Sequence, residues 1–167
     1  MIKGILQIIV NFLHMLNKII TEESSDIKYQ NIGEKEDLNL YQLSNTSKSK
    51  LETCHIDLQR VVLRAIQISS VDFGVSCGHR TLKEQQYLFS IGASKCDGIK
   101  YKSDHQNNPS NAVDLYAYVN GSANWEHKYY QDISEAMFCA ADELDIKIGW
   151  GGDWKTFKDS PHFYLDT

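Results

Sequence analysis

Two histidines and one aspartate have the residue types of a metal site that performs hydrolysis. His105 and Asp114 flank a short polar stretch, and His162 lies close to the end of the chain. Two imidazoles and one carboxylate are the usual protein ligands of a catalytic zinc ion, whose fourth position stays open for water. Asp159, just before His162, offers a carboxylate that can act as general base on that water. The spacing alone does not distinguish this zinc site from two alternatives, in which His105 is a solvated loop residue and His162 is an ordinary strand residue.

The two later members of this set are predicted to lie on strands. In residues 112–119 every second side chain is apolar, which is typical of a half-buried strand and turns Asp114 away from the apolar face. The last residues of the chain alternate in the same way, with His162 and Tyr164 on one face and Phe163 on the other. We therefore expect Asp114 and His162 on the non-core faces of two separate strands.

The segment before these strands is predicted to form a long helix and a first strand. Ser49 and Glu52 have the spacing of a capping box, and an apolar stripe continues from there to Ile68, which predicts one long helix. Alternating residues then predict a half-buried strand that ends at Cys77 and Gly78.

Two further capping boxes predict two more helices. Thr81 and Glu84 begin one helix that runs to about Ser90, and Asp132 and Glu135 begin the other. Helices and short strands in this order predict an α+β domain in which a small, mainly antiparallel sheet is flanked by helices and carries the zinc cleft.

Arg80 and a long loop complete the candidate site. Arg80 stands between the first strand and the helix that starts at Thr81, where a side chain can point into a cleft. Residues 91–110 have loop character and include His105. Loops of this length in a compact domain are more often functional than not.

Composition limits the classes of function. The chain has 167 residues, and 17 Lys and Arg against 22 Asp and Glu give a net charge of −5. One domain is therefore expected, and scattered basic residues on an acidic chain argue against nucleic acid as a partner. The four cysteines contain no CxxC pair, so neither a disulfide framework nor a cysteine-only metal cage is indicated.

The N-terminal residues differ from the rest of the chain. Residues 1–20 are predicted to form an amphipathic helix that associates with a membrane or packs on protein, because polar residues recur along one side of an apolar stretch. No small-residue cleavage site follows, so a cleaved secretory signal is not favoured. Residues 21–40 are interpreted as a linker, and residues 41–167 as the domain that carries the candidate zinc site.

Four segments in this order resemble a known family of zinc peptidases. They are Cys77-Gly-His-Arg80-Thr, Ser103-Asp-His105, Ala112-Val-Asp114-Leu and Gly151-Gly-Asp-Trp-Lys-Thr-Phe-Lys-Asp159-Ser-Pro-His162-Phe. The family comprises VanY-like D-alanyl-D-alanine carboxypeptidases, D-alanyl-D-alanine dipeptidases and phage L-alanyl-D-glutamate endolysins, and the similarity is greatest to the phage-type branch. It covers roughly residues 41–165, and the last segment is its most specific part.

The resemblance implies a role for each matching residue. It implies a zinc ion held by His105, Asp114 and His162, with Asp159 as general base. Arg80 would contact the substrate and stabilise the transition state, and Ser103 would contact the substrate. We also considered Trp150, Tyr116 and Trp154 as residues that line the groove, with core packing as the alternative for each.

The implied activity is hydrolysis of peptidoglycan stem peptides, most specifically the L-alanyl-D-glutamate bond, as in endolysins. The D-alanyl-D-alanine carboxypeptidase activity is the alternative, since those relatives share the same ligands. Without a cleaved signal, such an enzyme would stay in the cytoplasm until released, or at the membrane through residues 1–20, and would act on the cell wall. Nothing in the sequence indicates an oligomeric state.

One departure from the family pattern affects the ligands. In the family the aspartate follows the histidine by seven positions, whereas Asp114 follows His105 by nine (114 − 105). The extra residues lie within 106–111, and if they separated the ligands, the domain would be a catalytically degenerate cell-wall-binding module.

Two cysteine-based alternatives remain. One is a cysteine peptidase with Cys77 as nucleophile and His105 or His79 as base, although the next helix starts only at Thr81. The other is a structural zinc site among residues whose spacings do not repeat: Cys54, His55, Cys77, His79 and Cys96.

Overall fold

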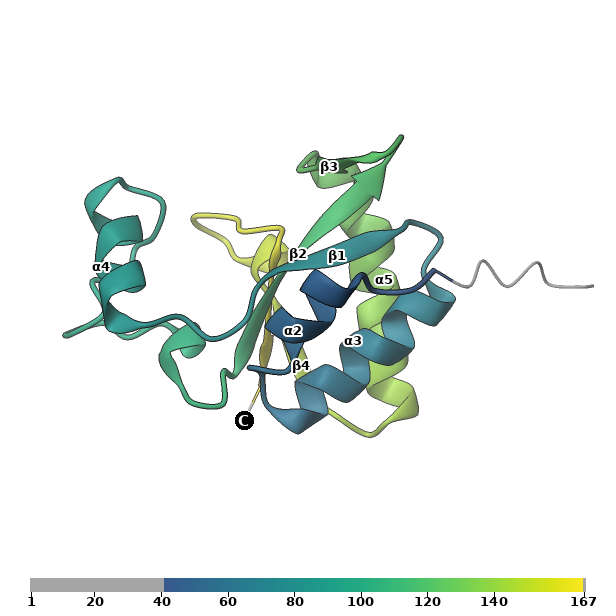
Figure 1. Ribbon diagram of the computed structural model, residues 1–167, viewed down its shortest axis with the longest axis horizontal. Helices are drawn as coiled ribbons and strands as arrows, with labels where there is room; N and C mark the ends of the chain where they lie inside the picture. Colours follow the sequence, from purple (N-terminus) through teal and green to yellow (C-terminus); the bar gives the residue numbers. More distant parts are fainter. Residues whose placement is uncertain (1–40, 167) are drawn as a thin grey trace, which may run out of the picture. The chain divides into compact units, whose positions relative to one another are not determined.

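The structure is a computed structural model that describes residues 41–166, and it combines helices with short strands (Figure 1). The helices are α2 (Asn45–Leu51), α3 (Ile56–Ile68), α4 (Leu82–Ser90) and α5 (His127–Glu143), with short 3-10 turns η1 (Asp104–Gln106) and η2 (Gly151–Asp153). The strands are β1 (Phe73–Cys77), β2 (Ala112–Val119), β3 (Ser122–Asn124), β4 (Ile148–Trp150) and β5 (His162–Leu165).

The strands form one antiparallel sheet in the order β1-β2-β5-β4, and β3 pairs with β2 as a hairpin. The register places Asp114 of β2 opposite His162 of β5 and also opposite Cys77 of β1. Side chains at directly opposed positions lie on the same face of a sheet. The sheet therefore gathers these three side chains on one face, as the alternating patterns predict for Asp114 and His162.

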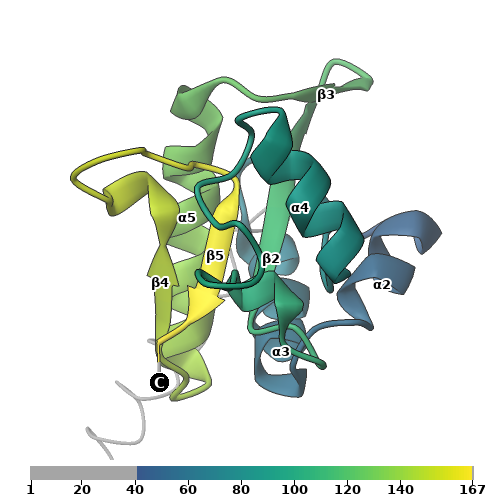
Figure 2. The same ribbon diagram turned by 90° about the vertical axis from the view of Figure 1, so that its left-hand side faces the viewer.

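The helices cover the two faces of the sheet unequally. Helices α3 and α5 pack on one face, and α4 lies on the opposite side, as two perpendicular views show (Figures 1 and 2). The core between the sheet and the α3–α5 pair contains fully buried Leu58, Val61, Leu115, Ile133, Met137 and Phe163. The prediction of an α+β fold with a small antiparallel sheet flanked by helices is confirmed.

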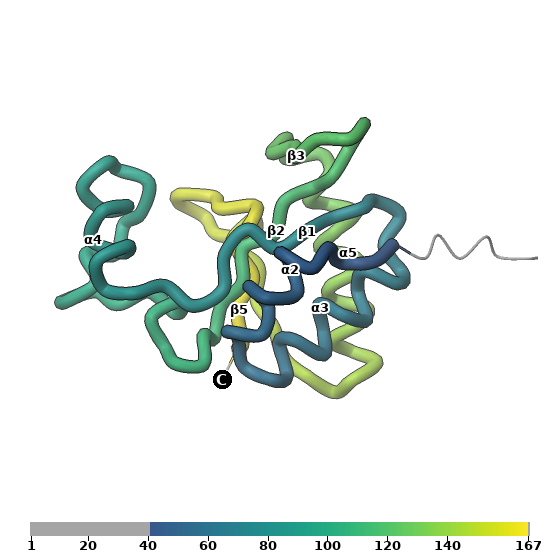
Figure 3. Tube along the Cα trace, in the orientation of Figure 1, coloured from purple at the N-terminus to yellow at the C-terminus, as the bar shows by residue number. Residues whose placement is uncertain are grey.

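The segment between β1 and β2 makes a long excursion from the sheet. In the trace of Figure 3 the chain leaves β1, runs out to α4, and returns through η1 to the start of β2. The predicted strand that ends near Cys77 is confirmed. The predicted capping box is confirmed as well, because the Thr81 hydroxyl accepts from the Glu84 N–H and the Glu84 carboxylate accepts from the Thr81 N–H.

The prediction of one long helix starting near Ser49 is wrong. The segment forms two helices, α2 capped by Ser44 and α3 capped by His55. At the break, Ser110 donates its N–H to the Thr53 carbonyl at 3.0 Å and accepts from the His55 N–H at 2.8 Å. These tertiary bonds replace helical ones, and they fasten the chain just ahead of β2.

The predicted start of the third helix is also wrong. Helix α5 begins at His127, so Asp132 and Glu135 lie inside it rather than at its cap. The strand β3 precedes it because Asn120 and Gly121 both have positive φ, 53° and 79°, the backbone of a tight hairpin turn.

The predicted N-terminal helix over residues 1–20 and the linker over residues 21–40 lie outside the described residues. Within residues 41–166, no helix has the length and apolar character needed to cross a membrane.

Candidate active site

Three candidate ligand atoms meet on the α4 side of the sheet. The Asp114 Oδ1 atom lies 3.1 Å from His105 Nε2 and 3.1 Å from His162 Nδ1, and the two nitrogens are 3.2 Å apart. Zinc bonds of about 2.0–2.2 Å place tetrahedral ligand atoms roughly 3.3–3.6 Å apart. The three atoms therefore fit one zinc ion after a small expansion.

The tautomer of His105 turns a ring nitrogen with a lone pair toward the other two candidate ligands. His105 Nδ1 lies 2.7 Å from the Gly78 carbonyl, which can only accept, so Nδ1 carries the hydrogen. In the neutral ring Nε2 then presents a lone pair to a carboxylate oxygen and a second imidazole nitrogen. A proton on one of the two facing nitrogens, or a metal ion in its place, can bridge them to the carboxylate.

The pKa shifts of Asp114 and His105 agree with a proton shared among the three candidate ligands. Burial alone would raise the pKa of Asp114, but hydrogen bonds from His105 and His162 hold this pKa far below its usual range. Burial lowers the pKa of His105, yet hydrogen bonds with Asp114 and Cys77 outweigh it and raise this pKa to about 9. His105 is therefore protonated at neutral pH in the metal-free protein.

Zinc binding is expected to release that proton. Because His105 must be neutral to bind a metal, the apparent zinc affinity should increase about tenfold for each pH unit between pH 6 and 8, below the His105 pKa. Calorimetric titration of metal-free protein with zinc, in buffers of different ionisation enthalpy, measures the protons released. An affinity that does not change over this range would contradict the assigned protonation of His105.

Backbone hydrogen bonds lock His105 to the end of β1. The Gly78 carbonyl holds its ring, and the His105 carbonyl accepts from the Arg80 N–H at 2.8 Å. A Cβ on Gly78 would stand 2.4 Å from the Lys50 carbonyl oxygen, so only glycine allows this approach. Ser103 caps η1 by accepting from the His105 N–H at 3.4 Å, so its hydroxyl helps to position His105.

The two extra residues between His105 and Asp114 do not separate the ligands. The Asp104 carbonyl accepts from the Asn111 N–H at 3.1 Å, which closes the base of the loop before β2 starts. Ser110 fixes the same turn through its hydroxyl, which donates to the Ala112 carbonyl at 2.7 Å. The insertion therefore loops out beside the site, and His105 still reaches Asp114.

Asp159 lies in the same cavity as the three candidate ligands. Its N–H donates to the Gly151 carbonyl at 3.0 Å, and a Cβ on Gly151 would lie only 2.5 Å from the Asp159 carbonyl oxygen. The glycine thus lets the loop that carries Asp159 fold against the start of β5. Burial, followed by the nearby charge of Asp114, raises the pKa of Asp159, which suits a general base better than an ordinary aspartate pKa would.

The cavity has a volume of about 520 Å³, within the range of ligand sites. Trp154 lines it, and so do five of the residues with predicted catalytic or metal-binding roles, which are His105, Asp114, His162, Asp159 and Arg80. Ser103 lines it as well.

Trp150 and Tyr116 are not among the residues that line this cavity. Trp150 is 8% exposed, stacks on Phe163 and donates to the Ser160 carbonyl at 2.7 Å, so it belongs to the core. Tyr116 covers Gly74 and contacts the ring of Trp125, which does line the cavity. The alternative of core packing therefore holds for Trp150, and Tyr116 supports the cavity wall from behind.

The Arg80 guanidinium is held mainly by two oxygen partners, and it also donates to Cys77 Sγ at 3.7 Å. One Nη donates to Asp114 Oδ2 at 3.0 Å, and the other donates to Gln85 Oε1 at 2.9 Å. Gln85 is fully buried, and its amide nitrogen donates to the Ser94 hydroxyl at 2.8 Å and to the Cys96 carbonyl at 2.7 Å. Gln85 thus ties Arg80 to the cavity wall, a role that the sequence analysis missed because a glutamine on a helix normally faces water.

Replacing Gln85 with leucine is expected to lower the free energy of unfolding by about 1–3 kcal/mol, because three partly buried polar groups lose their hydrogen bonds to Gln85. Hydrolysis should fall about tenfold, since Arg80 loses one of its two anchors. The neighbouring Gln86 is exposed on the same helix, so Gln86→Leu is the matched control. Thermal unfolding and kcat/KM of both variants test this, and equal effects at the two positions would contradict it.

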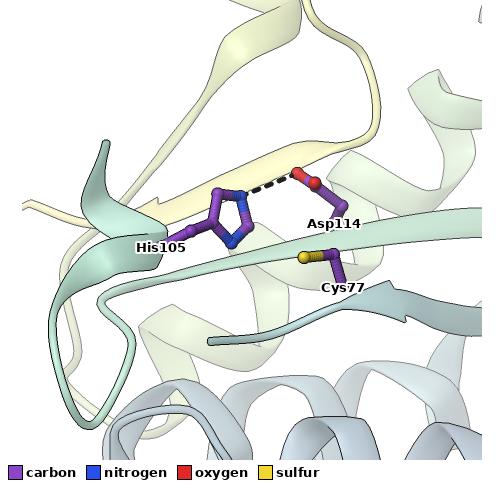
Figure 4. A group of neighbouring side chains, drawn as sticks. All are labelled: Cys77, His105 and Asp114. Carbon is purple, nitrogen blue, oxygen red and sulfur yellow. Dashed lines mark hydrogen bonds and ion pairs between the residues drawn. The ribbon is translucent and has the colours of Figure 1, made fainter. Parts of the chain in front are cut away.

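Cys77 lies beside the candidate ligands (Figure 4). A sulfur of Cys77, a ring nitrogen of His105 and a carboxylate oxygen of Asp114 lie within 4.8 Å of one another. His162 approaches the other two residues more closely, at 3.1–3.2 Å, so we assign the third ligand position to His162 rather than to Cys77. Cys54 is a core residue, because its thiol donates to the Ala112 carbonyl and burial raises its pKa to about 12.

The fold and the site together define a class of protein, an α+β domain with a candidate His-Asp-His metal site on an antiparallel sheet. Comparison with known proteins then identifies the family. Residues 39–164 match the phage L-alanyl-D-glutamate peptidase family, and the chain belongs to this family. The resemblance seen in the sequence motifs is thereby confirmed.

Individual relatives agree with this assignment. The L-alanyl-D-glutamate peptidase of Escherichia phage T5 is 28% identical over 120 residues, which are 71% of this chain and 85% of the phage protein. The peptidoglycan L-alanyl-D-glutamate endopeptidase CwlK of Bacillus subtilis (strain 168) is 29% identical over 102 residues, 57% of this chain and 61% of CwlK. The crystal structure of the Serratia marcescens L-Ala D-Glu endopeptidase ChiX superposes with a TM-score of 0.68 at 36% identity, covering 80% of this chain and 96% of ChiX.

Proposed function

We propose that the protein is a zinc-dependent endopeptidase that cleaves the L-alanyl-D-glutamate bond of peptidoglycan stem peptides. The observation that carries this proposal is the triangle of His105, Asp114 and His162 ligand atoms at 3.1–3.2 Å, with Asp159 in the same cavity. Membership in the family and the names of the relatives supply the choice of bond.

The site residues divide the chemistry among them. A zinc ion held by His105, Asp114 and His162 would polarise the scissile carbonyl and lower the pKa of water. Asp159 takes the proton from the attacking water and delivers it to the leaving amine of the D-glutamyl residue. Arg80 donates to the oxygen on which negative charge develops, while Gln85 and Asp114 hold its guanidinium in place.

The site of action follows from the substrate. We propose that the protein acts on the cell wall, with peptidoglycan stem peptides as its partner. The membrane association proposed for residues 1–20 would place it near that substrate.

The test is the metal content of the purified protein together with the release of amino groups from purified peptidoglycan, with and without a chelator. We expect stoichiometric zinc, release that stops with chelator and returns with zinc, and new amino-terminal D-glutamate in the products by mass spectrometry. Release of free D-alanine instead would establish the carboxypeptidase. Binding to peptidoglycan without any release would establish the degenerate binding module.

A further inference from the structure

The lining of the active-site cavity is rich in charge although the chain as a whole is acidic. Its cations are Arg80, Lys95 and Lys102, and its anions are Asp104, Asp114 and Asp159. Asp114 and Asp159 already have roles in the proposed chemistry. The three cations therefore determine which anionic groups of a substrate the cavity can accept.

Two of these cations are engaged by other groups. Arg80 pairs with Asp114 at 3.0 Å, and the ammonium of Lys95 lies 4.9 Å from the centre of the Phe157 ring. Lys102 forms no ion pair of 4.0 Å or less and no hydrogen bond with other residues in the range 41–166. Lys102 thus offers the cavity a cationic group that no carboxylate of the described residues pairs with.

The backbone next to Lys102 is fixed relative to the candidate metal ligands. Ser103 caps η1, its N–H donates to Gln106 Oε1 at 3.0 Å, and its hydroxyl accepts from the His105 N–H. Lys102 is therefore anchored on the same wall of the cavity as His105. Lys102 precedes His105 by three residues, and both line the same cavity.

The substrate offers a matching group at that place, and this step rests on the proposed function. Glutamate has two carboxyl groups, and only one of them can continue a linear stem peptide. The other is a free carboxylate, or a carboxamide when it is amidated, on the residue that supplies the leaving amine. We propose that Lys102 binds this free carboxylate and makes the enzyme prefer unamidated D-glutamate.

The size of the preference follows from the exposure of Lys102. A charged hydrogen bond contributes more than a neutral one, but solvent screens a pair at the mouth of a cavity. The wild-type protein should therefore cleave the carboxylate form about tenfold more efficiently than the carboxamide form, measured as kcat/KM. The ratio of the two values isolates the charge of the substrate from every other feature of the site.

The experiment compares two synthetic peptides that contain the L-alanyl-D-glutamyl bond and differ only in carboxylate or carboxamide at the second carboxyl. Lys102→Gln should reduce the kcat/KM ratio toward one, and Lys102→Arg should retain most of it. Lys100→Gln is the matched control and should keep the wild-type ratio. Lys100 is on the same loop but is not among the cavity-lining residues, and its ammonium lies over the Tyr101 ring.

The outcomes distinguish this proposal from the proposed function. A wild-type ratio near one, or an equal ratio in wild-type protein and Lys102→Gln, overturns the role of Lys102 while leaving the peptidase activity established. If the zinc-loaded protein cleaves neither peptide, the proposed function fails. The carboxylate site is then judged by calorimetric binding of the same two peptides. Preferential binding of the carboxylate peptide that Lys102→Gln removes supports the site, and equal binding of both peptides overturns it.

Discussion

Replacing Asp159 with alanine is expected to abolish hydrolysis while leaving zinc bound. Asp159 lies in the cavity with the three candidate ligands, but no hydrogen bond of 3.5 Å or less joins its carboxylate to them in residues 41–166. Removing this carboxylate should therefore eliminate proton transfer and leave the metal ligands in place. General base catalysis typically contributes 10²–10⁴-fold, so we expect kcat to fall by about 10³-fold or more.

The matched control for Asp159 is Asp153, another aspartate of the Gly-Gly-Asp-Trp segment. Asp153 is exposed on η2 and does not line the cavity. Asp153→Ala should keep both zinc and activity. Zinc content by elemental analysis and kcat on a defined peptide, measured for both variants, test this prediction. Activity retained in Asp159→Ala would remove Asp159 from the mechanism, and loss of zinc would make Asp159 a ligand instead.

The sequence predicts the faces of the strands well, because alternation is a local property. Asp114 and His162 are each set on the non-core face by their own neighbours, and the structure places them on that face. The pairing that brings them opposite one another depends on the antiparallel order of β2 and β5. Spacing alone cannot supply this order, and the family resemblance was needed to connect the two residues.

Trp150 illustrates the limit of motif-based assignment. It stands one residue before the Gly151-Gly152 pair in the most specific segment of the chain, yet it points to the core. Trp154 stands four residues later, inside that segment, and lines the cavity. The two tryptophans have the same chemistry, and only the path of the chain through η2 separates their roles.

Gln85 and the break between α2 and α3 show why tertiary contacts remain hidden in a sequence. The local pattern favours a continuous helix, but Ser110, far along the chain, binds the backbone of Thr53 and His55. Gln85 is buried only because the segment with Ser94 and Cys96 folds over it. Both features depend on residues that become neighbours only after folding, and both support the position of His105 or Arg80.

Replacing Arg80 with alanine is expected to reduce kcat/KM by about 10²–10³-fold without loss of the fold. A preorganised donor to a developing oxyanion typically contributes about this much. Arg80 can act in this way because its guanidinium is fixed on two sides, by Asp114 Oδ2 at 3.0 Å and by Gln85 Oε1 at 2.9 Å, which leaves further N–H groups for a substrate. Lysine has a single ammonium and cannot hold this geometry, so Arg80→Lys should recover only part of the activity.

The zinc content of Arg80→Ala distinguishes this catalytic role from a structural one. Asp114 keeps its contacts with His105 and His162 when Arg80 is removed, so zinc content and thermal unfolding should change little compared with kcat/KM. Arg60, exposed on α3 and paired only with Asp57 at 3.3 Å within residues 41–166, provides the arginine control, and Arg60→Ala should retain full activity. If Arg80→Ala instead loses zinc in proportion to activity, the main work of Arg80 is to hold Asp114 as a ligand. The oxyanion would then need another donor from the cavity wall.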